Sequence, residues 1–239
     1  MSVRVGDGRP FDQAALAALD TRLFGHIRSQ TSERDRLSLL ALHHACHEVH
    51  GRFTYLEIGS HLGGSLQVLV ADPSCVSIGS IDSRPESAPD VRGVSSYPGN
   101  TTERMLARLA AVPGADISKV SVIEAETVAI DPEELTAPQL CLIDGEHTHD
   151  AALADARFCR RVVREQGAIV FHDRRLVRSA IECFLAELGQ LPHEGYALLG
   201  SVYVIELGPT RLLPAVRAAL EGHEEPKPFL ADHPARRYP

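Results

Sequence analysis

The chain has 239 residues, of which 44% are apolar and 23% carry a charge. This balance is typical of a globular protein and excludes a disordered or fibrous chain. The net charge of −8 at pH 7 argues against a general nucleic-acid or anionic-membrane surface, which needs clustered basic charge. We therefore expect a globular protein without a nucleic-acid or membrane partner.

The expected cellular setting is reduced and cytoplasmic. Met1 to Gln13 contain no basic start followed by an apolar run, so they do not resemble a secretory signal. No run of about eighteen apolar residues occurs, so no membrane-spanning helix is expected. The five cysteines are an odd number without a C-x-x-C pair, which favours free thiols over a disulfide framework.

Residues 1–52 are predicted to be helical. Phe11 to Arg28 is rich in Ala and Leu, and a second run from Glu33 to Val49 has apolar residues at helical spacing, with Ser32 as its cap. No Pro/Gly linker follows. We therefore interpret these residues as an extension of one domain that covers the substrate or contacts a second subunit.

From residue 53 onward, short apolar runs alternate with helical stretches. The runs predict strands at Phe53–Ile58, Val76–Ile81, Val120–Ile123, Leu140–Ile143 and Ala168–Phe171. The predicted helices are Ser65–Ala71, Thr102–Ala111, Ala151–Glu165 and Arg175–Leu188. Apolar strands divided by crossover helices indicate a parallel sheet that is covered on both faces.

The end of the chain departs from this alternation. Tyr196–Leu199 and Val202–Leu207 are separated by only two residues, which is too short for a crossover helix and predicts an antiparallel hairpin. A helix at Arg211–Leu220 and a loosely held, Pro-rich tail (226–239) follow. The predicted fold is α/β: a mostly parallel, seven-stranded sheet over residues 53–225, with a terminal antiparallel hairpin and helices on both faces.

The first strand ends in a glycine-rich loop, where open α/β sheets bind ligands. It reads Glu57-Ile58-Gly59-Ser60-His61-Leu62-Gly63-Gly64-Ser65. Glycines let the backbone turn sharply and approach a ligand closely. An acid at Glu57 would repel a pyrophosphate but suits a ligand with an ammonium or sulfonium group, such as S-adenosylmethionine. The alternative is that Glu57 pairs with a neighbouring base and the glycines only make a turn.

A second acid, Asp82, ends the next strand, twenty-five residues after Glu57. An acid at this place can accept hydrogen bonds from ribose hydroxyls. Glu126, which follows the third predicted strand, is assigned to the same cofactor pocket. The predicted cofactor contacts are therefore Glu57, Gly59, Ser60, Gly63, Gly64, Ser65, Asp82 and Glu126.

Asp144 and Asp173 follow the fourth and fifth strands, so both carboxylates are expected at one edge of the sheet. A cation such as Mg²⁺ would relieve their repulsion and could hold two substrate oxygens. The alternative is that one caps a helix and the other binds backbone donors.

His147 is the candidate base, because an unperturbed imidazole with a pKa near 6.5 can take a hydroxyl proton at neutral pH. The alternative is that His147 is a polar loop residue.

Two further groups of histidines are assigned structural roles. His172 is expected to point away from its neighbour Asp173 if the strand continues. His43, His47 and His50 share a helical face, a spacing that could bind a soft metal, but a histidine stripe without a metal is favoured.

Together these motifs resemble the Asp-Gly-x-His branch of class I methyltransferases, which includes the macrocin-type and mycinamicin-type sugar O-methyltransferases and the cephalosporin hydroxylase-like proteins. The resemblance covers about residues 53–207 and is carried by the Glu57–Ser65 loop and by Ile143-Asp144-Gly145-Glu146-His147. It implies a Rossmann-like fold, S-adenosylmethionine along Gly59, Ser60 and Asp82, and Mg²⁺ on Asp144 and Asp173. His147 would then deprotonate a hydroxyl of a small natural product. Such enzymes are commonly oligomers, so a homo-oligomer is a further expectation.

Two other functions stay open from the sequence. Asp82 would equally suit the ribose of NAD in an oxidoreductase, although the glycine spacing and Glu57 argue against it. A ligand-binding protein without turnover is the other alternative, because His149 and Arg174 depart from the pattern of the family.

Overall fold

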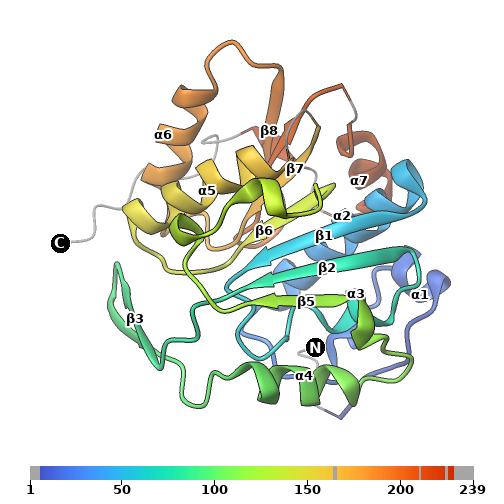
Figure 1. The fold of residues 1–239 in the computed structure, drawn as a ribbon. Coiled ribbons are helices and arrows are strands. Elements are labelled where there is room, and N and C mark those ends of the chain that lie inside the picture. The colour runs from blue at the N-terminus through green and yellow to red at the C-terminus, as the bar shows by residue number, and fades with distance from the viewer. Residues whose placement is uncertain (1–5, 164–165, 210, 224–225, 229–239) are drawn as a thin grey trace.

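A twisted sheet runs through the molecule with strands in the order β10-β8-β9-β7-β6-β1-β2-β5 (Figure 1). The computed structural model describes residues 6–163, 166–209, 211–223 and 226–228. The strands are β1 (Phe53–Ile58), β2 (Cys75–Ile81), β3 (Ser87–Asp90), β4 (Gly93–Ser96), β5 (Val120–Ile123), β6 (Leu140–Ile143), β7 (Gly167–Phe171), β8 (His193–Ala197), β9 (Tyr203–Leu207) and β10 (Lys227–Pro228).

The connectivity is that of an open, doubly wound sheet. The adjacent strands β5, β2, β1, β6 and β7 are parallel to one another, whereas β9 is antiparallel to both β7 and β8. The chain reverses direction across the sheet between β1 and β6, and ligands of such sheets bind at the carboxyl ends of the strands beside this reversal. The seven strands and the terminal hairpin confirm the predicted fold class.

One part of the predicted tail does not behave as expected. Residues 227–228 form β10, which pairs antiparallel with β8 and adds a short eighth strand at the edge of the sheet. The prediction of a loosely held tail is therefore wrong for these residues. Residues 229–239 lie outside the described part of the chain.

Helices cover both faces of the sheet (Figure 1). The helices are α1 (Gln13–Ala17), α2 (Glu33–His50), α3 (Gln67–Ala71), α4 (Thr102–Ala110), α5 (His149–Val163), α6 (Arg178–Leu188) and α7 (Leu213–Ala219), with short 3₁₀ turns η1 (Thr21–Phe24), η2 (Ile117–Lys119), η3 (Thr127–Ala129) and η4 (Pro132–Glu134). Buried residues of α1 to α4 and α7 share one apolar core, and those of α5 and α6 share a second. Because both faces are covered, all four residues of β6 are buried, which explains the continuous apolar runs.

The predicted helix from Phe11 to Arg28 is wrong. The helix α1 spans only five residues, Leu19 adopts a left-handed φ of 51°, and the 3₁₀ turn η1 follows. The break is fixed locally because the Asp20 carboxylate accepts a hydrogen bond from the Arg22 backbone N–H at 3.0 Å. Leu16, Leu19 and Leu23 are all buried, so the apolar residues that suggested one helix instead pack from a bent chain.

The N-terminal segment nevertheless belongs to the main core. The helix α2 begins at a capping box in which the Ser32 and Asp35 side chains bond each other's backbone N–H groups, and its buried residues join the core of α3 and α7. No helix in the described ranges is long and apolar enough to cross a membrane.

A hairpin that the sequence did not predict lies between β2 and α4. The strands β3 and β4 form a separate two-stranded antiparallel sheet with Val91 and Arg92 in the turn. Figure 1 shows it projecting beyond the ends toward which β1, β2 and β5 point. Its residues are mostly polar or small and show no apolar alternation, because most of them face solvent.

Candidate active site

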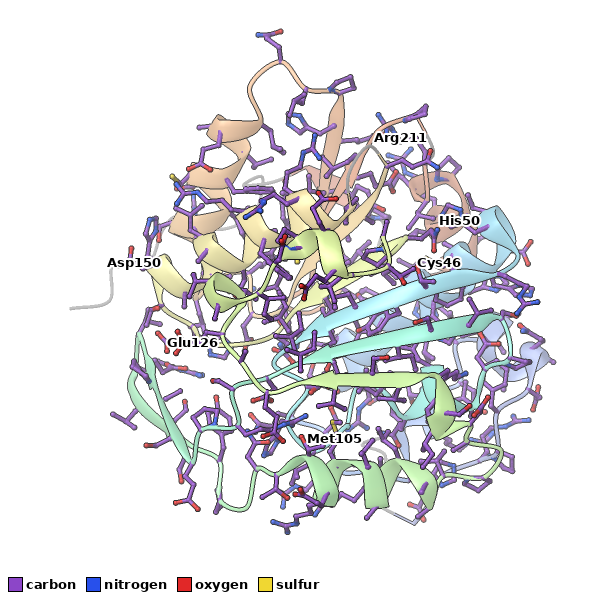
Figure 2. The ribbon with its side chains drawn as sticks, in the orientation of Figure 1. Cys46, His50, Met105, Glu126, Asp150 and Arg211 are labelled. Atoms are coloured by element: carbon purple, nitrogen blue, oxygen red, sulfur yellow. The ribbon has the colours of Figure 1, made fainter. Side chains whose placement is uncertain are left out.

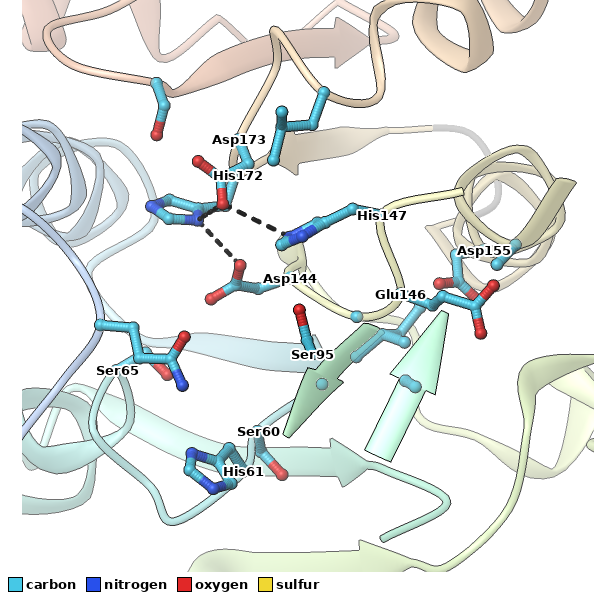
Figure 3. Close-up of a pocket in the computed structure, with 18 of the residues that line it drawn as sticks. Ser60, His61, Ser65, Ser95, Asp144, Glu146, His147, Asp155, His172 and Asp173 are labelled. Atoms are coloured by element: carbon cyan, nitrogen blue, oxygen red, sulfur yellow. Dashed lines mark ion pairs between the residues drawn. The ribbon is translucent and has the colours of Figure 1, made fainter. Parts of the chain in front are cut away.

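A cavity of about 990 Å³ lies at the carboxyl ends of the parallel strands, which is within the range of sites for small molecules. Its wall combines the glycine loop after β1, Asp82 after β2, the β3–β4 hairpin, the loops after β5, β6 and β7, the β8–β9 turn and the segment before α2. Figure 3 shows the polar side chains that project into it. This position matches the reversal point of the sheet.

Strand register brings the predicted residues to one level. Ile58 pairs with Ile81 on one side and with Ile143 on the other, and Ile143 pairs with Phe171. The residues that follow these partners are Gly59, Asp82, Asp144 and His172. Because parallel strands end together at one edge, residues far apart in the sequence line one wall.

The glycine loop packs against the next part of the site. Gly59 has a φ of +88°, and a Cβ added there would lie 2.6 Å from the Gly145 Cα atom. A Cβ on Gly64 would lie 2.9 Å from the Ser29 Cα atom. Glycine is therefore needed at both places, first against the loop after β6 and then against the segment before α2.

Asp82 holds the glycine loop as well as facing the cavity. One carboxylate oxygen accepts a hydrogen bond from the His61 backbone N–H at 2.8 Å, and the other accepts from the Arg84 backbone N–H at 2.7 Å. Asp82 is only 8% exposed. The buried Arg84 side chain reaches back to Ser60 at 3.2 Å, so the ends of β1 and β2 are cross-linked beneath the cavity.

Not every predicted cofactor residue faces the cavity. Gly59, Ser60, Gly64, Ser65, Asp82 and Glu126 line it. Glu126 lies at the same end of the sheet as the hairpin (Figure 2). Gly63 instead lies behind the wall, where an added Cβ would contact Leu109 and Met105.

Glu57 is fully buried behind the wall. The Tyr55 hydroxyl donates to its carboxylate at 2.7 Å, and the Ser65 hydroxyl donates to its other oxygen. Burial raises the pKa of Glu57 to about 8, against the opposing effect of these two donors. Glu57 therefore does not line the cavity itself but is hydrogen-bonded to Ser65, which does.

Asp144, His147 and Asp173 converge on one side of the cavity, as predicted (Figure 3). One ligand atom from each lies within 4.8 Å of the others. The His147 Nε2 atom lies 3.4 Å from an Asp173 oxygen. Asp173 adopts a left-handed φ of 49°, which turns the chain after β7 and carries its side chain toward His147.

The prediction that His172 points away from Asp173 is wrong. Its Nδ1 atom lies 2.8 Å from an Asp144 oxygen and 3.6 Å from an Asp173 oxygen (Figure 3). The alternation assumed by the prediction stops because β7 ends at Phe171. Although burial of the ring opposes its protonation, the neighbouring carboxylates, Asp144 first, raise the pKa of His172 to about 11. This imidazolium compensates the paired carboxylates.

Asp35 completes the surroundings of His172 and was not predicted. Its carboxylate lies 3.5 Å from His172 Nε2 and accepts hydrogen bonds from the Ser201 backbone N–H at 2.6 Å and the Ser201 hydroxyl at 2.8 Å. The capping-box spacing of Ser32 and Asp35 was the available signal, but it indicates a helix start rather than a site.

Asp90 is a second unpredicted member of the site. Its carboxylate lies 2.8 Å from His147 Nδ1, although the two residues are separated by 57 positions in the chain. The signal was absent because the hairpin that carries Asp90 has no recognisable strand pattern.

The donor set is compatible with a divalent cation. Mg²⁺ prefers oxygen ligands and usually binds through one or two carboxylates together with water or substrate oxygens, and Asp144 and Asp173 supply such oxygens within reach of each other. His172 lies against the same carboxylates, so a bound cation would share their charge with the imidazolium.

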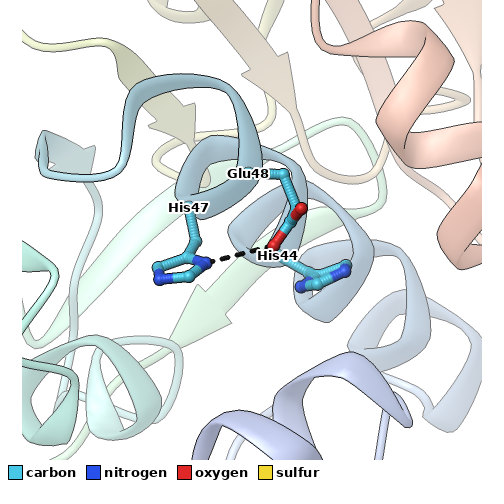
Figure 4. Close-up of side chains that lie close together, drawn as sticks. All are labelled: His44, His47 and Glu48. Atoms are coloured by element: carbon cyan, nitrogen blue, oxygen red, sulfur yellow. Dashed lines mark hydrogen bonds and ion pairs between the residues drawn. The ribbon is translucent and has the colours of Figure 1, made fainter.

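The histidines of α2 lie away from this site, as Figure 2 shows for His50. His43 is buried, and its Nε2 atom lies 2.5 Å from Asp72. His44, His47 and Glu48 instead bring their ligand atoms within 4.8 Å of one another (Figure 4). The stripe of His43, His47 and His50 is thus divided, with His43 in the core and His47 half-buried.

Comparison with known proteins adds the family. Residues 56–174, about half of the chain, match the family model described as "Methyltransferase domain". A search of curated proteins finds no match.

Among solved structures, the chain is similar to the O-methyltransferase TomG from Streptomyces achromogenes, crystallised with S-adenosylmethionine. The identity is 12%, the TM-score is 0.53, and the match covers 84% of this chain and 92% of TomG. The methyltransferase MycE from mycinamycin biosynthesis, crystallised with Mg and S-adenosylhomocysteine, has a TM-score of 0.53 at 15% identity, covering 84% of this chain and 56% of MycE. Cofactor-bound Rv0187 from MTB has a TM-score of 0.51 at 17% identity, and the match covers 82% of this chain and 89% of Rv0187.

Fold and site define a Rossmann-like domain with its ligand cavity at the carboxyl ends of the parallel strands. The chain belongs to the class I S-adenosylmethionine-dependent methyltransferases. The sequence resemblance to this class is confirmed.

Proposed function

We propose that this methyltransferase transfers the methyl group of S-adenosylmethionine to a hydroxyl of a small molecule, with His147 as the base. One observation carries the proposal: a single cavity joins Asp82 and the glycine loop to His147. A group held along the loop and a hydroxyl beside His147 would therefore share one enclosure. Positioning two reactants in this way is a main source of catalysis.

The chemistry divides between the bound cofactor and the protein. S-adenosylmethionine, when bound, supplies a methyl group activated on a sulfonium. The acids that line the cavity, including Asp82, Glu126 and Asp144, suit this positive charge. His147 Nε2 would take the hydroxyl proton as the acceptor oxygen bonds to the methyl carbon and the carbon–sulfur bond breaks, which would leave S-adenosylhomocysteine.

The acceptor is proposed to be a natural product such as a sugar or polyketide. Support comes from TomG, which is described as involved in tomaymycin synthesis, and from MycE of the mycinamycin pathway. The segment before α2 supplies Arg28 and Ser29 to the cavity wall, and the first turn of α2 supplies Arg34, which supports a role for residues 1–52 in covering the substrate.

Mg²⁺ is proposed as an accessory ion held by Asp144 and Asp173, where it would stabilise charge on the acceptor oxygen. A cytoplasmic location is proposed because the five cysteines are free and four of them are buried. The homo-oligomer and the absence of nucleic-acid or membrane partners stay predictions.

The first experiment is calorimetric titration of the protein with S-adenosylhomocysteine, with NADH as the competing ligand. The wild type is expected to bind S-adenosylhomocysteine and not NADH. Asp82→Asn is expected to weaken binding of S-adenosylhomocysteine at least about tenfold. The substitution removes the charged acceptor proposed for the ribose hydroxyls, and a hydrogen bond to a charged group is worth about 1.5–3 kcal/mol.

Asp116→Asn is the matched control. Like Asp82, Asp116 accepts a hydrogen bond from the backbone N–H two residues later, at 3.0 Å, but it does not line the cavity. Binding of NADH alone would replace the proposal with the oxidoreductase. Binding of S-adenosylhomocysteine without transfer to any hydroxylated acceptor in a broad panel would favour the ligand-binding alternative.

A further inference from the structure

The β3–β4 hairpin touches the active site at Asp90. Among the described residues, its two strands pair only with each other, apart from an isolated parallel bridge between Asp90 and His147. The Asp90 side chain is 2% exposed, whereas the neighbouring Val94 is 77% exposed. One buried carboxylate thus stands out on an otherwise solvent-facing hairpin, and it is directed at the candidate base.

Asp90 is held as an anion by its own hairpin. One oxygen accepts from the Arg92 Nε atom at 2.7 Å and from the Arg92 backbone N–H at 2.9 Å, and the other accepts from Arg92 Nη2 at 2.7 Å. Arg92 is the largest influence that holds the pKa of Asp90 well below its usual range. Two parallel hydrogen bonds between a guanidinium and a carboxylate fix the orientation of the Asp90 carboxylate.

The charged neighbours decide which nitrogen of His147 carries the proton. A carboxylate only accepts, so the 2.8 Å contact with Asp90 requires a hydrogen on Nδ1. Arg92 Nη2 also lies near Nδ1, at 3.5 Å, but the much shorter contact to Asp90 prevails. The lone pair of the neutral ring is then on Nε2, which is buried, lies 3.4 Å from Asp173 and makes no hydrogen bond within the described ranges.

We infer that Asp90 is a positioning residue that fixes the Nδ1–H tautomer of His147, so that Nε2, on the side of Asp173, is the basic nitrogen. The inference rests on the proposed function for the identity of the base. Nε2 and the Asp173 carboxylate are neighbouring acceptors 3.4 Å apart, so a substrate hydroxyl would donate its proton to one of them, and on the proposed function that one is Nε2. The β3–β4 hairpin thereby contributes to catalysis, because His147 has the required tautomer only while Asp90 is hydrogen-bonded to its Nδ1 atom.

The test is nitrogen-15 NMR of the histidine rings at one neutral pH, with the His147 signals assigned by their loss in His147→Gln. The wild type is expected to show an N–H shift at Nδ1 and a lone-pair shift at Nε2. In Asp90→Asn, the amide can donate to Nδ1, so the Nε2–H form is expected to rise to a large fraction. Asp116→Asn, an exposed aspartate with the same bond to the backbone N–H two residues later, is expected to leave the ring unchanged.

The wild-type spectrum tests the inference without any variant, since Nε2–H as its dominant form would overturn it. An unchanged ring in folded Asp90→Asn would also overturn it. Titration with S-adenosylhomocysteine tests the proposed function separately. Asp90→Asn should bind this ligand as the wild type does, because Asp90 is not among the residues that line the cavity. With an acceptor in hand, kcat should fall about 10- to 100-fold in Asp90→Asn at an unchanged KM for S-adenosylmethionine.

Discussion

Gly59→Ala tests whether the close approach of the β1 loop to the β6 loop builds the cofactor site. The substitution has two separable costs. A φ of +88° costs an alanine about 1–2 kcal/mol. The added Cβ would also lie 2.6 Å from the Gly145 Cα atom, and forcing such overlap on packed backbone costs about 1–3 kcal/mol. We expect a total loss of about 2–5 kcal/mol in the free energy of unfolding.

Gly114→Ala isolates the first cost. Gly114 has a φ of +80°, and an added Cβ would meet nothing within 4 Å, so we expect a loss of only about 1–2 kcal/mol. Both proteins would be unfolded with urea and titrated with S-adenosylhomocysteine. Only Gly59→Ala should lose affinity, because relief of the overlap moves the loop that lines the cavity. Equal destabilisation of the two variants, with full affinity in both, would refute the reasoning.

Three further results are expected. His147→Gln should lower methyl transfer about 10²- to 10⁴-fold in a radiolabel assay while leaving S-adenosylhomocysteine affinity intact; a parallel loss of affinity would argue against a base. His172→Asn leaves Asp144 and Asp173 without their buried cation, so it should lose about 3 kcal/mol of stability and gain more from Mg²⁺ in thermal unfolding than the wild type does; equal gains would contradict this account. Glu57, with a pKa raised from 4.5 to about 8, keeps its proton in the folded state longer than in the unfolded state. Stability should therefore fall as pH rises between these values, by at most about 1.4 kcal/mol per pH unit, and Glu57→Gln should flatten that slope in urea titrations.

Much of the scaffold could be predicted from local pattern. The bounds of β1, β5 and β6 coincide with the predicted apolar runs. The reason is clearest for β6, whose four residues are apolar and buried because the sheet is covered on both faces. The short connection before β9 correctly predicted an antiparallel pair. The predicted helix over residues 11–28 is wrong, because a segment rich in Leu and Ala can bury these side chains either as one straight helix or, as observed, as a chain that bends at Leu19.

The sequence by itself placed Asp82, Asp144, His147 and Asp173 at one end of a parallel sheet, because a residue that follows a buried strand must lie at that edge. Only the tertiary structure decided what these residues contact. Asp90 reaches His147 across 57 positions of the chain, and Asp35 reaches His172 from another layer of the fold. Neither partner follows a parallel strand, so neither carries a local signal. These pairings give the buried carboxylates of Asp90 and Asp35 partners inside the fold, because a buried charge without a partner is costly.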